Sequence, residues 1–363
     1  RELRSVAEDN SDAASRAVLG IGSGGATLRD PRGSDSSVRA ATGGDATDGS
    51  GADGADRADT RAVEAAEPED EGAGTDGVAG GPPSTIPSMP DLDVEYGDIS
   101  KGERIGEGGS ADIFEATVET PDGTYTGALK EPRMSGTLHG DVMDRFVTEA
   151  ETWAELDDHD FVVDVMARGS TPLPWLLMEY MDGGNLSEYT GALSFDQAVW
   201  TARCVTEGVY HAHSHGVAHL DLKPENVLFR TTGAETWPVP KVGDWGLVRA
   251  LLGDDGGVDG LTPQYAAPEQ VDPDRFGDPD QATDVYQLGA VFYALFVGRP
   301  PVEGEGGTAL ERVLDGDVVA PSEADPSLPA ALDDVLLTAL AREKADRYES
   351  VLYLRDALEA IGE

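Results

Sequence analysis

One stretch, H-L-D-L-K-P-E-N-V-L-F at positions 219–229, constrains the chain more than any other. Asp221 is followed by Lys223 and then by Asn226, and the segment ends in apolar residues, which predicts a loop leading into a short strand. Phosphoryl transfer from ATP requires a carboxylate that accepts a proton, oxygen ligands for Mg²⁺, and positive charge near the phosphates. These three residues can supply one of each. A polar surface loop with chance spacing is the alternative.

A glycine-rich turn near the start of the folded region is a second candidate for phosphate binding. Strands are predicted at 101–106 and 112–118, and Ile113 lies in the second. The turn between them comprises Gly106, Glu107, Gly108, Gly109, Ser110 and Ala111. Glycine lets backbone N–H groups approach phosphate oxygens closely. Taken alone, this stretch is better explained as an ordinary glycine-rich turn.

A strand and a helix follow, each with one charged residue of interest. The alternating segment T-Y-T-G-A-L-K ends at Lys130, as in a half-buried strand. A helix predicted over 141–156 has an apolar face formed by Phe146, Ala150, Trp153 and Ala154. Glu149 lies beside this face, whereas Glu151 and Glu155 are expected to face solvent.

The rest of the chain supplies two short motifs in a largely helical context. The motifs are D-W-G at 244–246 and A-P-E at 267–269. Strands are predicted at 161–167, 173–180 and 241–244, and a capping box at Ser194 and Gln197 starts a helix that runs to about residue 215. Further helices are predicted at 282–297, 308–315, 328–341 and 349–361.

In this order, the motifs resemble those of eukaryotic-type Ser/Thr protein kinases of prokaryotic flavour. The family patterns are G-x-G-x-x-G-x-V, a strand lysine, H-R-D-L-K-x-x-N, D-F-G and A-P-E. The chain departs from them at Ala111, Leu220 and Trp245. The resemblance implies an α+β, two-lobed fold, with a β-rich N-lobe at 97–181 and a helical C-lobe at 182–363.

The resemblance also implies catalytic roles, with ATP and Mg²⁺ as cofactors and protein Ser/Thr hydroxyls as acceptors. Asp221 would be the catalytic base, and Lys223 would stabilise the transferred group. Lys130, held by Glu149, would orient the α and β phosphates. Asn226 and Asp244 would hold Mg²⁺, which prefers hard oxygen ligands.

The remaining site residues follow from the same resemblance. The ATP site would comprise the turn from Gly106 to Ala111 together with Ile113, Ala128, Lys130, Met178, Glu179 and Met181, the hinge residues offering backbone groups to adenine. Structural roles are implied for His219, Glu269, Asp284 and Arg347. Among these, Asp284 would hold the catalytic loop, and Arg347 would pair with Glu269.

Activation by phosphorylation is not expected. In many kinases an arginine before the catalytic aspartate holds a phosphate on the activation segment. That position is Leu220 here, and the segment 247–267 has only Thr262 and Tyr265 as hydroxyl residues, together with Asp254, Asp255 and Asp259. We therefore predict activity without phosphorylation of this segment.

The charge of the chain points to its working environment. The sequence has 26 Lys and Arg against 70 Asp and Glu, a net charge of −44, and the acids are dispersed rather than blocked. Such charge destabilises a compact state by self-repulsion unless salt screens it. A protein of an extreme halophile is therefore expected, an acidic docking surface for basic partners being the alternative. Nucleic acid is not an expected partner.

Residues 1–90 have the composition of a disordered tail or linker, rich in Ala, Gly and Asp and without aromatics. Ser84, Thr85 and Ser88 could be phosphorylated in cis. The chain starts at Arg1 rather than Met, which suggests a fragment or a processed chain.

Neither a disulfide nor a membrane segment is expected. Cys204 is the only cysteine, and the apolar run 285–297 is too short to span a bilayer. We therefore expect a cytoplasmic location, and no sequence pattern indicates an oligomeric state.

Three alternatives compete with the kinase interpretation. The first is a pseudokinase scaffold that binds nucleotide without transfer, and the second is a kinase of small molecules. A metal site at His211, His213, His215 and His219 is disfavoured, because these residues do not share one helix face and lack matching acidic or Cys partners.

Overall fold

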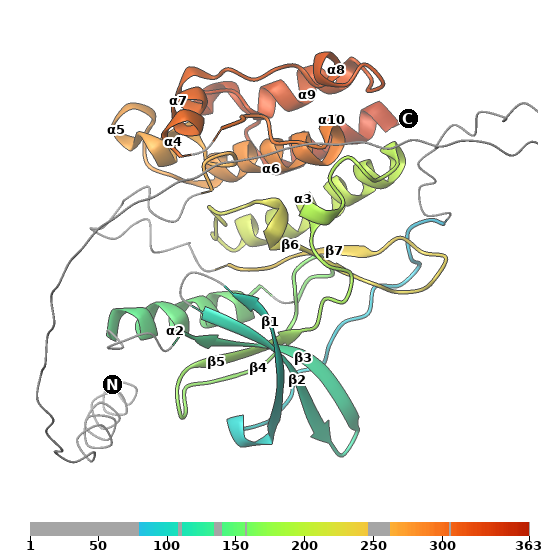
Figure 1. Ribbon diagram of the computed structural model, residues 1–363, viewed down its shortest axis with the longest axis vertical. Helices are drawn as coiled ribbons and strands as arrows, with labels where there is room; N and C mark the ends of the chain where they lie inside the picture. The colour runs from blue at the N-terminus through green and yellow to red at the C-terminus, as the bar shows by residue number, and fades with distance from the viewer. Residues whose placement is uncertain are drawn as a thin grey trace, which may run out of the picture. The chain divides into compact units, whose positions relative to one another are not determined.

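The computed structural model describes residues 80–107, 111–133, 140–156, 158–245, 262–304 and 306–362. The chain divides into units 1–70 and 71–363, and every described residue belongs to the second. This unit has a strand-rich N-lobe and a helical C-lobe, joined by the segment that follows β5 (Figure 1).

A five-stranded antiparallel sheet with the order β1-β2-β3-β5-β4 forms the N-lobe. Its strands are β1 (Ile99–Glu107), β2 (Ala111–Thr120), β3 (Gly123–Pro132), β4 (Val165–Gly169) and β5 (Trp175–Glu179). Helix α2 (Gly140–Ala154) lies beside the sheet, and its Phe146, Ala150 and Trp153 enter the main apolar core. A separate apolar cluster includes Leu129, Trp175 and Leu177.

The C-lobe is built around helix α6 (Gln281–Val297), which is buried from Thr283 to Phe296. Asp280 begins the helix by accepting a hydrogen bond from the backbone of Ala282, and Gly298 ends it in the left-handed region at φ 82°. The longer helices around it are α3 (Phe195–Ser214), α7 (Gly307–Asp315), α9 (Ala331–Ala339) and α10 (Val351–Gly362).

Short elements complete this lobe and carry the loops of the cleft. Strands β6 (Val227–Arg230) and β7 (Val239–Val242) form a two-stranded antiparallel sheet. The one-turn helices are α4 (Pro268–Val271), α5 (Pro273–Phe276) and α8 (Pro321–Ala324). None of the described helices is both long and apolar enough to cross a membrane.

One predicted strand begins later than expected. The segment predicted as a strand at 161–167 enters the N-lobe sheet only at Val165, where β4 starts. Before that, Val163 donates its backbone N–H to the carbonyl of Val242, and Val242 donates to the carbonyl of Phe161. The run is apolar throughout, so the sequence pattern does not show where it leaves one lobe for the other.

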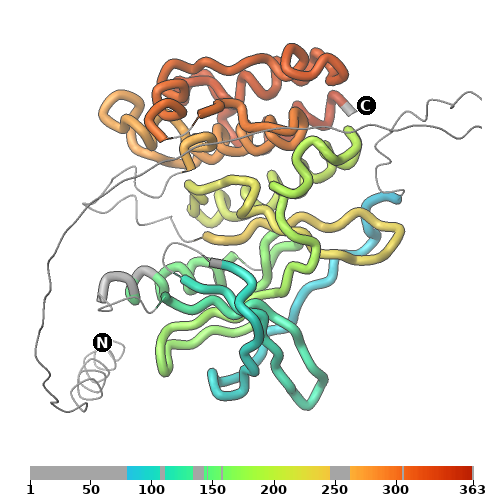
Figure 2. Tube along the Cα trace, viewed as in Figure 1, coloured from blue at the N-terminus to red at the C-terminus, as the bar shows by residue number. Residues whose placement is uncertain are grey.

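Residues 80–90, expected as part of the tail, lie against the folded domain. Trp237 donates its backbone N–H to the carbonyl of Gly81, at 2.9 Å. Further along, Ile86 packs in an apolar cluster with Phe161 and Trp200, and the backbone N–H of Met89 donates to Asp164. We call residues 80–95 the N-terminal strap; Figure 2 shows it running from the β6–β7 side to the sheet.

Candidate active site

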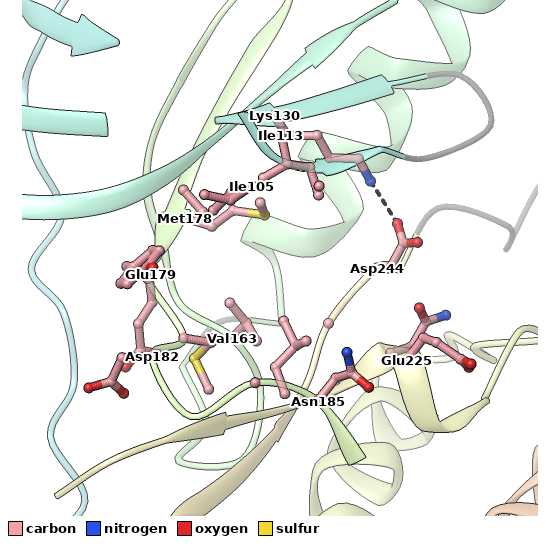
Figure 3. A pocket seen from close by; sticks show the side chains of 18 of the residues that line it. Ile105, Ile113, Lys130, Val163, Met178, Glu179, Asp182, Asn185, Glu225 and Asp244 are labelled. Atoms are coloured by element: carbon pink, nitrogen blue, oxygen red, sulfur yellow. Dashed lines mark hydrogen bonds and ion pairs between the residues drawn. The ribbon is translucent and has the colours of Figure 1, made fainter. Parts of the chain in front are cut away.

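A cleft of about 440 Å³ lies between the lobes (Figure 3). Its walls are apolar, and the side chains that form them come from both lobes: Ile105, Ile113, Ala128, Met178, Met181 and Leu228. At one end the lining becomes polar, with Lys130, Asn226 and Asp244. The cleft can therefore hold a flat apolar group at one end and a charged group at the other.

Lys130 lies at the centre of the polar end. Its Nζ donates to Asp244 Oδ1 at 2.6 Å and also to Glu149 Oε1, so residues of β3, α2 and the D-W-G motif meet there. Burial alone would lower the pKa of Lys130, but the charges of Asp244 and Glu149 outweigh it and raise the pKa. In turn, Lys130 lowers the pKa of Asp244 to about 2. Lysine and aspartate are therefore both ionised at neutral pH.

The catalytic-loop candidates lie on the C-lobe side of the cleft. Asp221 is buried, and its Oδ2 accepts hydrogen bonds from Lys223 Nζ at 2.7 Å and from Asn226 Nδ2 at 3.3 Å. Asn226 Nδ2 also donates to the carbonyl of Asp221, at 2.8 Å. Burial raises the pKa of Asp221, although the charge of Lys223 opposes the shift. A carboxylate with a raised pKa is a stronger proton acceptor than a carboxylate with an unshifted pKa.

Asp284 of α6 holds the start of this loop. Its two carboxylate oxygens accept the backbone N–H groups of His219 and Leu220, each at 2.7 Å. His213 Nε2 lies 2.7 Å from the same carboxylate, a contact that the sequence analysis did not predict. His219 is fully buried, and its Nε2 lies 3.0 Å from the carbonyl of Gly243, which ties the loop to the D-W-G motif.

Two residues of the site have left-handed backbone conformations. Leu220 and Asp244 both have φ of 63°, which is uncommon for residues other than glycine. Trp245, the departure from D-F-G, is fully buried and belongs to the same apolar cluster as Trp153 of α2. Its ring packs against His219, with 4.7 Å between the ring centroids.

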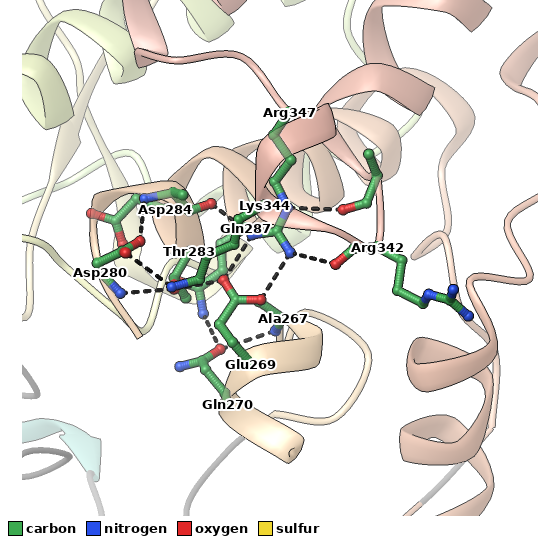
Figure 4. Close-up of polar contacts among 12 residues, drawn as sticks. Ala267, Glu269, Gln270, Asp280, Thr283, Asp284, Gln287, Arg342, Lys344 and Arg347 are labelled. Carbon is green, nitrogen blue, oxygen red and sulfur yellow. Dashed lines mark hydrogen bonds and ion pairs between the residues drawn. The ribbon is translucent and has the colours of Figure 1, made fainter. Parts of the chain in front are cut away.

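Glu269 and Arg347 meet deep in the C-lobe, as Figure 4 shows. Arg347 donates Nη1 to Oε1 of Glu269 at 2.7 Å and Nη2 to Oε2 at 2.8 Å. Thr283 donates its hydroxyl to the same Oε1. The pair holds the A-P-E motif against α6 and the segment before α10.

The hinge candidates lie at the apolar end of the cleft. Met178, Glu179 and Met181 line it, but the side chain of Glu179 is buried and accepts a hydrogen bond from Lys241 at 2.7 Å. The backbone N–H of Glu179 already donates to the carbonyl of Asp164, so only its carbonyl could meet a base. Lys241 also donates to Asp164, whose carboxylate accepts the backbone N–H of Met89 in the strap. No sequence motif indicates this buried cation.

Part of the predicted glycine-rich turn lies outside the described residues. The undescribed residues of the turn are Gly108, Gly109 and Ser110. In the activation segment, Asp254, Asp255 and Asp259 also lie outside the described residues. Glu107 is the last residue of β1, Gly106 lines the cleft, and Ala111 is buried at the start of β2. The Gly106 end of the turn therefore lies at the cleft.

The donor set at the polar end suits a Mg²⁺ ion. Asp244 is ionised, and Asn226 uses its amide nitrogen to bond Asp221, which leaves its amide oxygen as the atom for a cation. Across the described ranges, no group of three or more His, Cys, Asp or Glu residues is arranged to hold a metal ion.

Comparison with known proteins agrees with this geometry. Residues 99–352, more than half of the chain, match the family described as protein kinase domain, so the chain belongs to the protein kinase family. Its α+β, two-lobed fold is the protein kinase fold.

Several bacterial kinases are similar to this chain. The serine/threonine-protein kinase Pkn1 of Myxococcus xanthus is 33% identical over 288 residues, which cover 74% of this chain and 39% of Pkn1. PknL of Mycobacterium tuberculosis is 31% identical over 267 residues, covering 72% of this chain and 64% of PknL. PknB of the same species is 32% identical, covering 58% and 34%. The chain thus spans about one third to two thirds of these relatives.

Proposed function

We infer that this chain transfers the γ-phosphoryl group of ATP to Ser and Thr hydroxyls of proteins. One observation carries this proposal: Lys130, Asn226 and Asp244 come from three separate segments and line the polar end of one cleft, where Asn226 bonds Asp221 and Lys130 contacts Glu149. The bacterial relatives named as serine/threonine-protein kinases support Ser and Thr as acceptors.

In this proposal each residue acts through position and charge. Lys130, fixed by Glu149, binds the α and β phosphates at the polar end of the cleft. Asp221 accepts the proton of the substrate hydroxyl, and Lys223, now 2.7 Å from Asp221, neutralises charge on the transferred group. Asn226 and Asp244 hold Mg²⁺, which supplies charge neutralisation between the phosphates when bound. Orientation of this kind contributes several kcal/mol to lowering the barrier, on the order of 7–11 at most.

The conditions of action are also part of the proposal. A net charge of −44 favours folding in concentrated salt, as in the cytoplasm of an extreme halophile, and disfavours nucleic acid as a partner. The single cysteine, Cys204, is buried, and burial raises the pKa of its thiol, so the thiolate form is disfavoured.

Acceptor identity is the direct test of this function. The chain is incubated with γ-labelled ATP, Mg²⁺ and a generic protein substrate in high KCl, and the labelled protein is hydrolysed to its amino acids. Label on phosphoserine or phosphothreonine is the expected result. Label on metabolites but never on protein would identify a small-molecule kinase. Nucleotide binding without any transfer would identify a pseudokinase, which the departures at Ala111, Leu220 and Trp245 leave as the second candidate.

A further inference from the structure

The peptide groups on both sides of Asp221 are held by two buried glutamines. The backbone N–H of Leu222 donates to Gln287 Oε1 at 3.0 Å. The carbonyl of Leu220 accepts from Gln287 Nε2 at 3.2 Å and from Gln270 Nε2 at 2.8 Å. The same two side chains therefore set the direction in which the backbone presents the Asp221 carboxylate.

The two amides also bond each other and the A-P-E motif, as Figure 4 shows. Gln287 Nε2 donates to Gln270 Oε1 at 3.0 Å, and the same oxygen accepts the backbone N–H of Ala267, also at 3.0 Å. Gln287 is 2% exposed and Gln270 is 8% exposed, so water does not compete for these groups. Helices α4 and α6 and the catalytic loop are thereby joined through one amide pair, which we call the glutamine link.

Leu220 has a backbone conformation that its surroundings must hold and a side chain that cannot itself make a polar contact. This residue is buried and has φ of 63°, a conformation that a bulky side chain adopts only when its surroundings impose it. Its apolar side chain cannot bond a phosphate or a carbonyl. A connection between the catalytic loop and the segment before A-P-E therefore cannot run through the side chain at position 220. The neutral amides provide that connection without any added charge.

We propose that Gln270 and Gln287 are positioning residues that fix Asp221 for phosphoryl transfer. The proposal rests on the kinase function proposed above. Neither glutamine lines the cleft, so the link acts on the loop and not on nucleotide binding. Loss of the link should therefore lower the rate of transfer and leave the affinity for ATP unchanged.

Kinetics of three variants of the full chain test this separation. In Gln270→Met, Gln287→Met and the double variant, the side chains keep their length but lose their hydrogen bonds. We expect kcat to fall at least tenfold in each single variant, with KM for ATP within twofold of the wild type. Because the two amides share bonds, the double variant should fall no more than about threefold below the worse single variant. Gln281→Met is the matched control and should keep the wild-type kcat, because this exposed residue on the helix of Gln287 donates its amide to the carbonyl of His213 rather than to the catalytic loop.

Unchanged kcat in the variants, with only a lower unfolding temperature, would overturn the proposal by showing a purely structural role. Amide hydrogen exchange separates this outcome from failure of the proposed function. Even if the wild type transfers no phosphoryl group, the variants should exchange faster at residues 219–226 and not in α10, and equal exchange would overturn the proposal.

Discussion

At the scale of single residues, the ion pair of Glu269 and Arg347 is the most deeply buried charge contact of the C-lobe described here. Both side chains are fully inaccessible to solvent, and the pair is bidentate. Removing two charges from water is costly, and this geometry offsets the cost because every polar atom finds a partner. Removing one partner would leave the other charge buried and uncompensated.

Arg347→Met should therefore lower the free energy of unfolding by about 3–5 kcal/mol. Urea unfolding in high KCl, followed by tryptophan fluorescence, measures this loss. Combining Arg347→Met with Glu269→Gln should destabilise less than the sum of the two single changes, since no lone charge remains. A loss below about 1 kcal/mol in the single variant, the size typical of exposed ion pairs, would contradict the account.

Three histidines whose rings contact one another in sequence form a second residue-scale feature. The ring centroids of His159 and His211 are 4.7 Å apart, and those of His211 and His215 are 4.5 Å apart. Burial lowers the pKa values of His159 and His211, and the neighbouring imidazoles lower them further. Nearby Asp158 opposes both shifts.

The sign of the resulting pH dependence follows from linkage. An unfolded histidine has a pKa of about 6.5, so below that pH the unfolded chain binds more protons than the folded one. The charge of Asp160 raises the pKa of His159 and the charge of Lys241 lowers it, and the net shift with these charges included is downward. Stability should be fully present above about pH 6.5 and should decrease as pH falls toward the lowered pKa values.

His211→Gln should flatten this part of the stability curve. Thermal unfolding of the wild type and the variant between about pH 7.5 and 5.5, at constant KCl, gives the two slopes. The wild type should lose stability on acidification faster than the variant. Parallel slopes would show that the imidazoles do not titrate differently in the folded state.

At the scale of elements, the N-terminal strap is an addition to the two lobes. Ile86 packs with Phe161, Trp200 and Val239, while Leu92 donates its backbone N–H to the carbonyl of Met166 in β4. The strap thus contacts both the apolar cluster that includes α3 and the N-lobe sheet. Its apolar contacts should contribute to the stability of the domain.

Replacing Ile86 by Ala should reduce the unfolding free energy by roughly 1–2 kcal/mol, as expected for a half-buried aliphatic side chain. Val319→Ala, which shortens an exposed aliphatic side chain, is the control and should change stability by less than about 0.5 kcal/mol. Equal effects of the two changes, measured by denaturant unfolding, would mean that the strap is not bound in solution.

Local patterns in the sequence predict much of the fold and most of the site, because the residues of each kinase motif lie close together in the chain. The buried helix at 282–297 was predicted within one residue of its observed start, and residues 219–229 bring Asp221, Lys223 and Asn226 together without help from distant segments. A continuous apolar run and a fixed spacing carry this information directly.

Contacts between distant polar residues could not be predicted in this way. Lys241 meets Glu179 and Asp164, which are 62 and 77 residues away in the chain. Gln270 and Gln287 are ordinary polar residues until the fold places them on the peptides beside Asp221. A glutamine inside an otherwise apolar helix is the sequence feature that indicates such a contact, because a buried amide requires hydrogen-bond partners.

At the scale of the whole molecule, the main feature is the excess of acidic over basic side chains. The 70 acidic residues outnumber the 26 basic ones, and residues 91–363 alone carry 53 acidic and 18 basic side chains. Self-repulsion of this size opposes folding at low ionic strength, and at about 1 M salt the Debye length falls to about 3 Å. Activity and folding should therefore rise together with KCl.

The most direct test of the central claim is label transfer from γ-labelled ATP to protein, measured from low to molar KCl for the wild type and Asp221→Asn. We expect phosphorylated Ser or Thr that increases with salt in the wild type and is nearly abolished in the variant, while both proteins bind ATP equally. Asparagine keeps the shape of the side chain but cannot accept the proton. Equal transfer by the two proteins, or no transfer at any salt by a folded wild type that binds ATP, would contradict the claim.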